Sequence, residues 1–248
     1  KAAKAAPDGY TLLLFHVGMA TTPTMYRKLN YNVLNDFEFA GMINDVPMTL
    51  LGRKTLPANT YPELVKWLGE NKNKVNLANA GLGSASHLCG LMFQAAVQID
   101  MTTVPYKGTA PAMNDLLGGQ VDVMCDQTTQ TIPHIKAGSV KFYGVTTKQR
   151  IKALPDAPTL HEQGLKDFEM VVWHGIYAPK GTPADITAKM NTALRASLKD
   201  AEVMRRFAEL GAEIVPDSKQ TPAALQTWLK SEIDRLGPLI RAAGKFAD

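Results

Sequence analysis

The chain has 248 residues, of which 45% are hydrophobic and 20% are charged, with a formal net charge of +4. This composition argues against a disordered chain, and no segment approaches the ~18 consecutive apolar residues of a membrane span. Lysine and arginine are scattered as short pairs rather than gathered into a stripe, which disfavours nucleic-acid binding and leaves attraction of small anions open.

The first residues of the chain have the pattern of a segment that normally follows other secondary structure. Residues 1–6 resemble the tail of a helix, and a Pro7-Asp8-Gly9 turn leads into a strand at 10–15. Because chains seldom begin at the end of a helix, we expect residues to precede Lys1. No signal peptide is visible in 1–6, since an apolar segment of the required length is absent, so export stays open.

The middle of the chain alternates strands and helices. Strands that alternate with helices of ~10–15 residues predict a parallel α/β sheet with right-handed crossovers. The expected strands are 75–78, 101–104, 121–125 and 140–146, and the expected helices are 85–96, 110–117 and 131–137.

The last third is predicted to be mostly helical. Thr182-Pro183 is typical of a helix start, with threonine as the cap and proline in the first turn. Further helices are expected at 201–210, before Gly211, and from Thr221-Pro222 to about 243.

Two segments, 46–53 and 168–178, have the character of long strands that pass between lobes. Their positions predict two lobes, one formed by residues 50–171 and the other by 1–49 together with 172–248. The length of the chain suits two lobes of ~120 residues each.

The loop that leads into the helix at 85–96 is the most informative motif. Backbone N–H groups of Gly83, Ser84, Ala85 and Ser86, with the serine hydroxyls, would cradle an anion at the positive end of the helix dipole. The alternative is a tight turn in which Ser84 only caps the helix. A dinucleotide fingerprint lacks its third glycine here, and a phosphate-binding P-loop lacks its lysine.

Metal and nucleophilic sites are not supported by the cysteines and histidines. No complete zinc-ligand spacing occurs, so neither a metal nor a cofactor is expected. Cys89 lies on the apolar side of a predicted helix, where an inert thiol is the common state. His87 is interpreted as a hydrogen-bonding residue of the first helical turns, and as a candidate for ligand contact, rather than as a base.

Four further residues are candidates for ligand contact. Asp126 directly follows a strand, where α/β folds place ligands, although it would equally cap the next turn. Ala20 and Thr21 follow the first strand and would bring a helix N-terminus toward a ligand. Trp173 lies in a crossing strand, either as the wall of a cleft or as a core residue.

A series of motifs in order resembles the Bug/TctC family of extracytoplasmic solute receptors, which serve tripartite tricarboxylate transporters. The resemblance covers essentially the whole chain. Its motifs are Pro7-Asp8-Gly9-Tyr10-Thr11-Leu12-Leu13, the loop 79–88, Val104-Pro105-Tyr106-Lys107-Gly108, Gly118-Gly119-Gln120-Val121-Asp122, His134-Ile135-Lys136-Ala137-Gly138, Leu154-Pro155-Asp156-Ala157-Pro158-Thr159 and Ala178-Pro179-Lys180-Gly181-Thr182-Pro183.

The resemblance implies a type II periplasmic binding-protein fold, in which two α/β lobes close on a ligand in the cleft between them. It further implies that carboxylates are bound, without catalysis, by two strand–helix loops. One loop matches residues 80–86, and the other belongs to a strand–helix unit that would precede Lys1.

Our hypothesis is a periplasmic receptor, expected to be a monomer, that delivers an organic acid to membrane transporter subunits. The alternatives are an α/β enzyme acting on a small carboxylate and a sensor domain that presents its ligand. An oxidising periplasm would allow a disulfide between Cys89 and Cys125, the alternative being two buried thiols.

Overall fold

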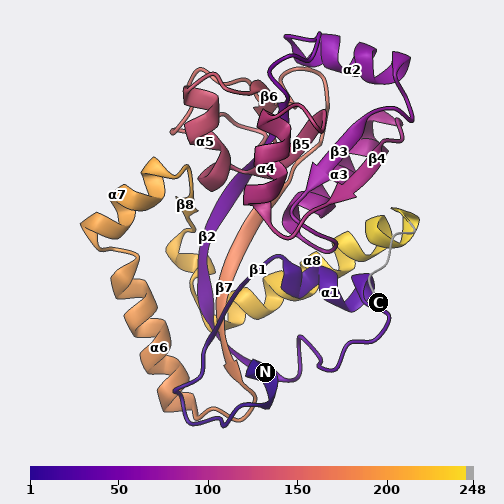
Figure 1. The fold of residues 1–248 in the computed structure, drawn as a ribbon. Helices are drawn as coiled ribbons and strands as arrows, with labels where there is room; N and C mark the ends of the chain where they lie inside the picture. Colours follow the sequence, from indigo (N-terminus) through magenta and orange to yellow (C-terminus); the bar gives the residue numbers. More distant parts are fainter. Residues whose placement is uncertain (244–248) are drawn as a thin grey trace. The chain divides into compact units, whose positions relative to one another are not determined.

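A computed structural model describes residues 1–243, and the chain divides into two compact units. Unit 1 consists of residues 1–45, 173–208 and the described chain from 213 onward, whereas unit 2 consists of 46–172 and 209–212. The boundaries at 45/46 and 172/173 fall inside the two long strands β2 (Phe37–Gly52) and β7 (Val171–Pro179). Each unit is described separately below (Figure 1).

Unit 2 is a sheet with helices between its strands. Strand β3 (Asn76–Asn79) pairs in parallel with β4 (Thr102–Pro105) on one side and with β5 (Val123–Gln127) on the other. The second half of β2 joins this sheet and pairs with β5 and with β6 (Lys141–Val145). The helices are α2 (Tyr61–Glu70), α3 (Ala85–Val97), α4 (Thr109–Leu117) and α5 (Thr128–Lys136).

The predicted parallel pairing is confirmed for β3 with β4 and β5, whereas β2, predicted only as a long strand passing between lobes, joins their sheet antiparallel to both β5 and β6. Its register sets Thr49 opposite Asp126 and Val145. The physical reason is connectivity. In the βα units from β3 to β5, each helix crosses over so that the next strand runs in the same direction. Strand β2 precedes these units and continues a strand of unit 1, so its direction is not set by a helical crossover.

Apolar packing holds the elements of unit 2 in place. Ala112, Met113 and Leu116 of α4 are buried in one cluster with Leu51 of β2 and Met124 of β5. Each buried CH₂ group stabilises the fold by about 0.8 kcal/mol. For such a short helix, this packing therefore contributes more stability than helix propensity does. The N-terminus of α4 is thereby fixed beside the end of β5.

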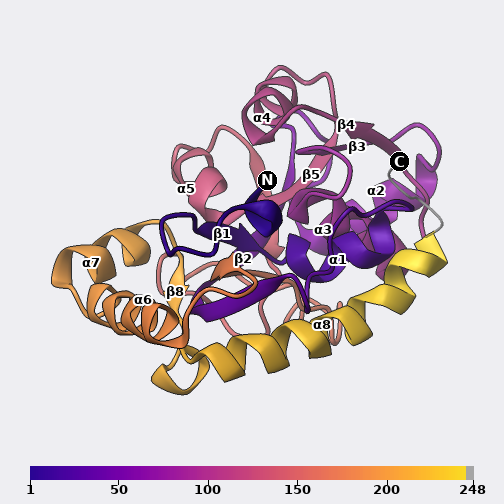
Figure 2. The ribbon, with the colours of Figure 1, turned by 90° about the horizontal axis from the view of Figure 1, so that it is seen from below.

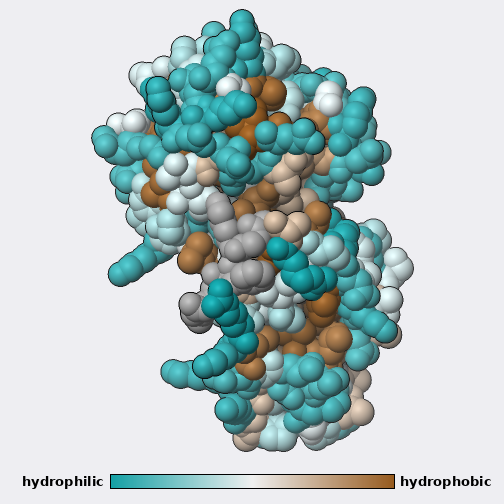
Figure 3. All heavy atoms as spheres, turned by 90° about the vertical axis from the view of Figure 1, so that its right-hand side faces the viewer, coloured by the Kyte–Doolittle hydropathy of each residue, from teal (hydrophilic) through white to brown (hydrophobic). Residues whose placement is uncertain are grey.

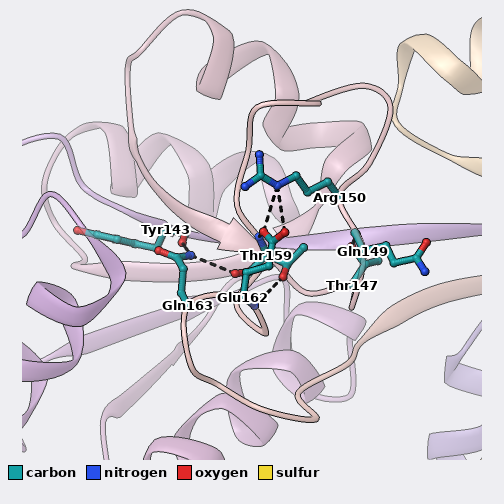
Figure 4. Close-up of polar contacts among 7 residues, drawn as sticks. All are labelled: Tyr143, Thr147, Gln149, Arg150, Thr159, Glu162 and Gln163. Carbon is teal, nitrogen blue, oxygen red and sulfur yellow. Dashed lines mark hydrogen bonds and ion pairs between the residues drawn. The ribbon is translucent and has the colours of Figure 1, made fainter.

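The connection from β6 to β7 contains the Leu154–Thr159 motif and is fixed by polar contacts (Figure 4). The Glu162 carboxylate accepts from the N–H of Thr159 at 2.9 Å, and the Thr159 hydroxyl accepts from the N–H of Glu162 at 2.9 Å. Arg150 pairs with the same carboxylate at 3.1 Å. Gln163 donates to the carbonyl oxygen of Tyr143, so the connection is anchored to β6.

Unit 1 contains the remaining strands. Strand β1 (Leu13–His16) pairs antiparallel with β7, β7 neighbours the first half of β2, and β8 (Glu213–Ile214) also pairs with β2. Helix α1 (Gly18–Met25) packs along α8 (Pro222–Ala243), as Figures 1 and 2 both show. The other elements are α6 (Ala184–Ser197), α7 (Ala201–Glu209) and the short 3₁₀ turns Ala2–Lys4 and Asp217–Lys219.

Several element boundaries differ from the sequence-based expectation. The predicted helix tail at 1–6 is only the 3₁₀ turn Ala2–Lys4, and the first strand begins at Leu13 rather than at residue 10. Thr182 does not cap α6: its hydroxyl donates to the carbonyl of Pro179 at 2.8 Å, and Pro183 occupies the cap position. A local side-chain bond to the preceding turn therefore replaces the expected cap.

Within residues 1–243, every helix is too short or too polar to cross a bilayer. The face drawn in Figure 3 is mostly hydrophilic, with apolar patches between the polar side chains. The most exposed large apolar side chain of the described chain is Tyr10, at 94%, and Leu12 and Leu14 nearby are also exposed.

Candidate functional site

The loop between β3 and α3 has a shape that two glycines make possible. Gly81 and Gly83 adopt φ values of +119° and +79°, in the region that side chains with a Cβ rarely enter. A Cβ on Gly81 would also lie 2.9 Å from the carbonyl oxygen of Tyr106. The backbone of this loop is therefore held in one conformation at the N-terminus of α3.

Ser84 is the N-cap of α3, because its hydroxyl accepts from the N–H of His87 at 3.1 Å. Two of the four predicted anion donors are used inside the loop. The N–H of Ser84 donates to the carbonyl of Gly81 at 3.1 Å, and the N–H of Gly83 donates to Nδ1 of the buried His87 ring at 3.3 Å. These two bonds stabilise the loop, and their N–H groups are therefore not available to a ligand.

Two predicted donors remain, the N–H groups of Ala85 and Ser86 in the first turn of α3, and the loop before the helix adds the N–H of Leu82. None of them has an acceptor in the part of the chain that the structure describes. The first N–H groups of a helix lack intrahelical acceptors and lie at the positive end of its dipole. We call these three groups the α3 cradle; their chemistry suits an anion.

Asp126 lies at the end of β5, in contact with the Ser86 side chain of the cradle, and is only 1% exposed. Its carboxylate accepts from the N–H of Gln127 at 2.7 Å and from the hydroxyl of Thr109 at 3.0 Å. The Ser86 side chain is a further partner, although its hydroxyl also donates to the carbonyl of Cys125 at 2.6 Å.

Asp126 thus gathers the first turn of α3, the first residue of α4 and the N-cap of α5 around one carboxyl group. Burial raises its pKa to about 6, and the hydrogen bonds it accepts lower the pKa only in part. Because both oxygens already accept bonds from the protein, contact with a ligand stays a prediction from the sequence.

A disulfide fixes α3 to β5 next to this carboxyl group. It joins Cys89 and Cys125, both fully buried, with their Cα atoms 6.0 Å apart. Cys89 lies one turn into α3 and Cys125 directly precedes Asp126. The cradle and the Asp126 carboxyl group are therefore held by a covalent bond in addition to hydrogen bonds.

The predicted residues Ala20 and Thr21 belong to unit 1, in the first turn of α1. Their N–H groups both donate to the carbonyl of Val17, at 2.9 and 3.3 Å. The N–H of Gly18 donates to Nδ1 of His16 at 2.9 Å. Burial lowers the pKa of His16, which favours the neutral ring that this acceptor role requires.

Trp173 also belongs to unit 1 and is completely buried. Its indole N–H donates to the Glu232 carboxylate at 3.2 Å, which in turn pairs with Arg235 at 2.6 Å. The structure brings Ser84, Ala85, Ser86, His87 and Asp126 together in unit 2. The association of this group with Ala20, Thr21 and Trp173 stays a prediction.

Sequence reasoning missed Asn79, Leu82 and Thr109. Thr109 stands at a helix start directly after a glycine, a signal that could have placed it near Asp126 at the same edge of the sheet. Asn79 ends β3, and its side-chain oxygen accepts from the N–H of Gly81 at 2.9 Å. Nothing in the sequence distinguishes the N–H of Leu82 from those that the loop uses internally.

No group of three or more His, Cys, Asp or Glu side chains suited to a metal ion occurs among residues 1–243. The site described above consists of neutral hydrogen-bond donors next to a buried carboxyl group.

The comparisons with known proteins agree with an anion site. A family model described as the tripartite tricarboxylate transporter family receptor matches residues 1–245. A protein of Agrobacterium vitis, encoded in the TAR-I ttuE-ttuC' intergenic region, is 50% identical over 98% of this chain and 70% of its own length.

Two solved structures extend the comparison to the fold. The periplasmic binding protein BugD is 46% identical with a TM-score of 0.93, over 100% of this chain and 82% of its own. MatC of Rhodopseudomonas palustris, solved with bound malate, is 35% identical with a TM-score of 0.90, over 96% of this chain and 82% of its own.

Proposed function

The chain belongs to the receptor family of tripartite tricarboxylate transporters, and we propose that its α3 cradle binds one carboxylate of a small dicarboxylate. The protein is a periplasmic solute-binding receptor for carboxylates and has no catalytic function. Its fold is the mixed α/β fold of periplasmic binding proteins such as BugD.

The observation that carries the proposal is the set of backbone donors that the protein itself leaves without acceptors. Leu82, Ala85 and Ser86 offer three N–H groups at the N-terminus of a 13-residue helix. The Ser84 hydroxyl accepts from His87, so its own hydrogen is the fourth candidate donor. A carboxylate accepts bonds from such donors and is favoured by the helix dipole.

Energetics indicate that the cradle works with other contacts. A helix N-terminus contributes about 0.3–2 kcal/mol to a nearby charge, whereas micromolar binding requires about 8 kcal/mol. Charge-assisted hydrogen bonds and exclusion of water must supply the remainder. The helix dipole alone is therefore insufficient, and the second carboxylate and the rest of the ligand must make further contacts.

Asp126 bears on which acids are accepted. An ionised Asp126 would repel a second, unshielded carboxylate, so we expect the part of the ligand near Asp126, apart from the carboxylate that the α3 cradle holds, to carry a hydroxyl or an apolar group. Malate, the ligand in the MatC structure, has a hydroxyl beside one of its carboxylates. Hydroxy-dicarboxylates are accordingly the acids to test first.

The partner follows from the family. We propose that the receptor delivers its acid to the membrane subunits of a tripartite tricarboxylate-type transporter. Deletion of the receptor gene should abolish uptake of the bound acid, and a plasmid copy should restore it.

The test of binding is calorimetric titration with malate and succinate, and with their diamides as matched controls. We expect one acid per chain, recovered chemically unchanged, and no heat from the diamides. Equal binding of acids and diamides would refute a carboxylate at the cradle, and conversion of the acid would refute the receptor role.

A further inference from the structure

One buried polar group at the cradle has no partner. The side-chain nitrogen of Asn79 makes no hydrogen bond within the described chain, although Asn79 is only 1% exposed. Buried amide groups almost always have partners, because leaving them without one costs free energy. Asn79 ends the strand that leads into the cradle loop.

The orientation of this amide is fixed by its own oxygen. Oδ1 of Asn79 accepts from the N–H of Gly81 at 2.9 Å. A flipped amide would bring its NH₂ group against that N–H, donor against donor, so the flip is excluded. The NH₂ group belongs to the same planar carboxamide and therefore also lies at the loop.

The backbone carbonyl of Asn79 is already paired, since it accepts from the N–H of Tyr106 at 3.0 Å. The side-chain NH₂ is the polar group of Asn79 that is buried without a partner in the described chain. It lies at the same loop as the N–H of Leu82, which also has no acceptor in the described chain.

We infer that the Asn79 side chain donates a hydrogen bond to the carboxylate bound in the α3 cradle. This inference rests on the proposed function and adds a specificity-determining residue to it. The ligand class it selects is a planar anion whose two oxygens accept from neutral donors, one from the helix N-terminus and the other from the carboxamide.

Two substitutions separate this role from the turn that Asn79 also forms. Asn79→Ser keeps a hydroxyl acceptor for the N–H of Gly81 but is too short to place a donor where the amide does. Asn79→Asp keeps the acceptor and replaces the NH₂ group by a charged oxygen. Asn114→Ser and Asn114→Asp are matched controls, because Asn114 is an exposed amide on α4 of the same unit.

Malate titration of the five proteins should give a clear order. We expect affinity to fall about tenfold to a hundredfold in Asn79→Ser, as for loss of one bond to a charged group. The fall should be larger in Asn79→Asp, where two negative charges meet. Both Asn114 variants should match the wild type.

A second measurement uses the wild type and does not depend on how the variants fold. The assigned NH₂ proton signals of Asn79 should move downfield when ¹⁵N-labelled protein is saturated with malate, whereas those of Asn114 should not. If Asn79→Ser binds malate as tightly as the wild type, or if the Asn79 signals stay in place, the inference is wrong and the proposed function stands. If the wild type binds no acid in the panel, the proposed function itself fails.

Discussion

Helices α1 and α3 start in similar ways and end up with different chemistry at their N-termini. Both follow a four-residue strand and begin with one small residue, Gly18 in α1 and Ala85 in α3. In α1, the N–H groups of Gly18, Ala20 and Thr21 are satisfied by His16 and Val17. In α3, those of Ala85 and Ser86 have no acceptor in the described chain.

The difference arises from the residue before each helix. Val17 precedes α1 in the αR conformation, so its carbonyl accepts from the first turn and no side chain caps the helix. Ser84 precedes α3 in an extended conformation and caps it by its side chain, which accepts only from His87. A helix N-terminus therefore binds anions only where the local turn has not used its donors.

The largest effect is expected from removing the disulfide that holds α3. Loss of the bond between Cys89 and Cys125, 36 residues apart, should destabilise unit 2 by about 4 kcal/mol in the chain-entropy model. Hydrogen exchange before and after reduction should show faster exchange in α3 than in α1, which packs on α8 instead. The Cys89→Ala/Cys125→Ala double variant should not respond to the reductant. Unchanged exchange in α3 would contradict the prediction.

Asp126 should make stability depend on pH. Its pKa rises from 3.8 to about 6 on folding, so the folded state binds more protons between pH 4 and 6. Stability from this group is then highest below pH 4 and falls as pH rises to about 6, by about 3 kcal/mol in total.

Asp126→Asn should remove this dependence. Urea unfolding at pH 4.5, 5.5 and 7 measures it as the difference between wild type and variant, because other titrating groups cancel. A difference that stays constant across the three values would mean that Asp126 ionises normally. The α1 region offers no equivalent carboxyl group among the contacts described above.

A proline at the first position of α3 tests the free donors directly. Ala85→Pro removes one cradle N–H, while proline is well tolerated at the first helical position and Ser84 already has the extended conformation that must precede it. We expect malate affinity to fall about tenfold to a hundredfold. The control is Ala184→Pro at the exposed start of α6, which should leave affinity unchanged. Equal malate affinities for the two variants would mean that the free N–H groups at the start of α3 do not bind the ligand.

The smallest effect is expected from Ser84→Ala. Loss of the cap bond to His87 should cost about 1 kcal/mol of stability. Malate affinity should fall only a few-fold, since the backbone donors remain. Thermal unfolding and calorimetry measure the two effects separately, and a loss of affinity as large as that of Ala85→Pro would mean that the hydroxyl, not the backbone, carries binding.

The sequence was sufficient for the features that depend on local patterning. Alternation of apolar strands and amphipathic helices predicted β3 to α5 within a few residues, and the motif order identified the family that the comparisons then established. The position of Ser84 at the start of α3 followed from its neighbours alone.

Features that depend on contacts between residues distant in the sequence could not be predicted. The N–H of Gly83 is used by His87 because the ring folds back onto the loop, which spacing alone does not indicate. The pKa of Asp126 depends on burial and on Thr109, 17 residues earlier in the chain. The antiparallel entry of β2 depends on the direction from which that strand arrives.

The disulfide also has a consequence for biogenesis. Cys89 and Cys125 are the two cysteines of these 248 residues, so within this part of the protein their thiols can form a single disulfide. During export from the N- to the C-terminus, Cys125 reaches the periplasm only 36 residues after Cys89. Within these 248 residues, a thiol oxidase is therefore sufficient to form the bond.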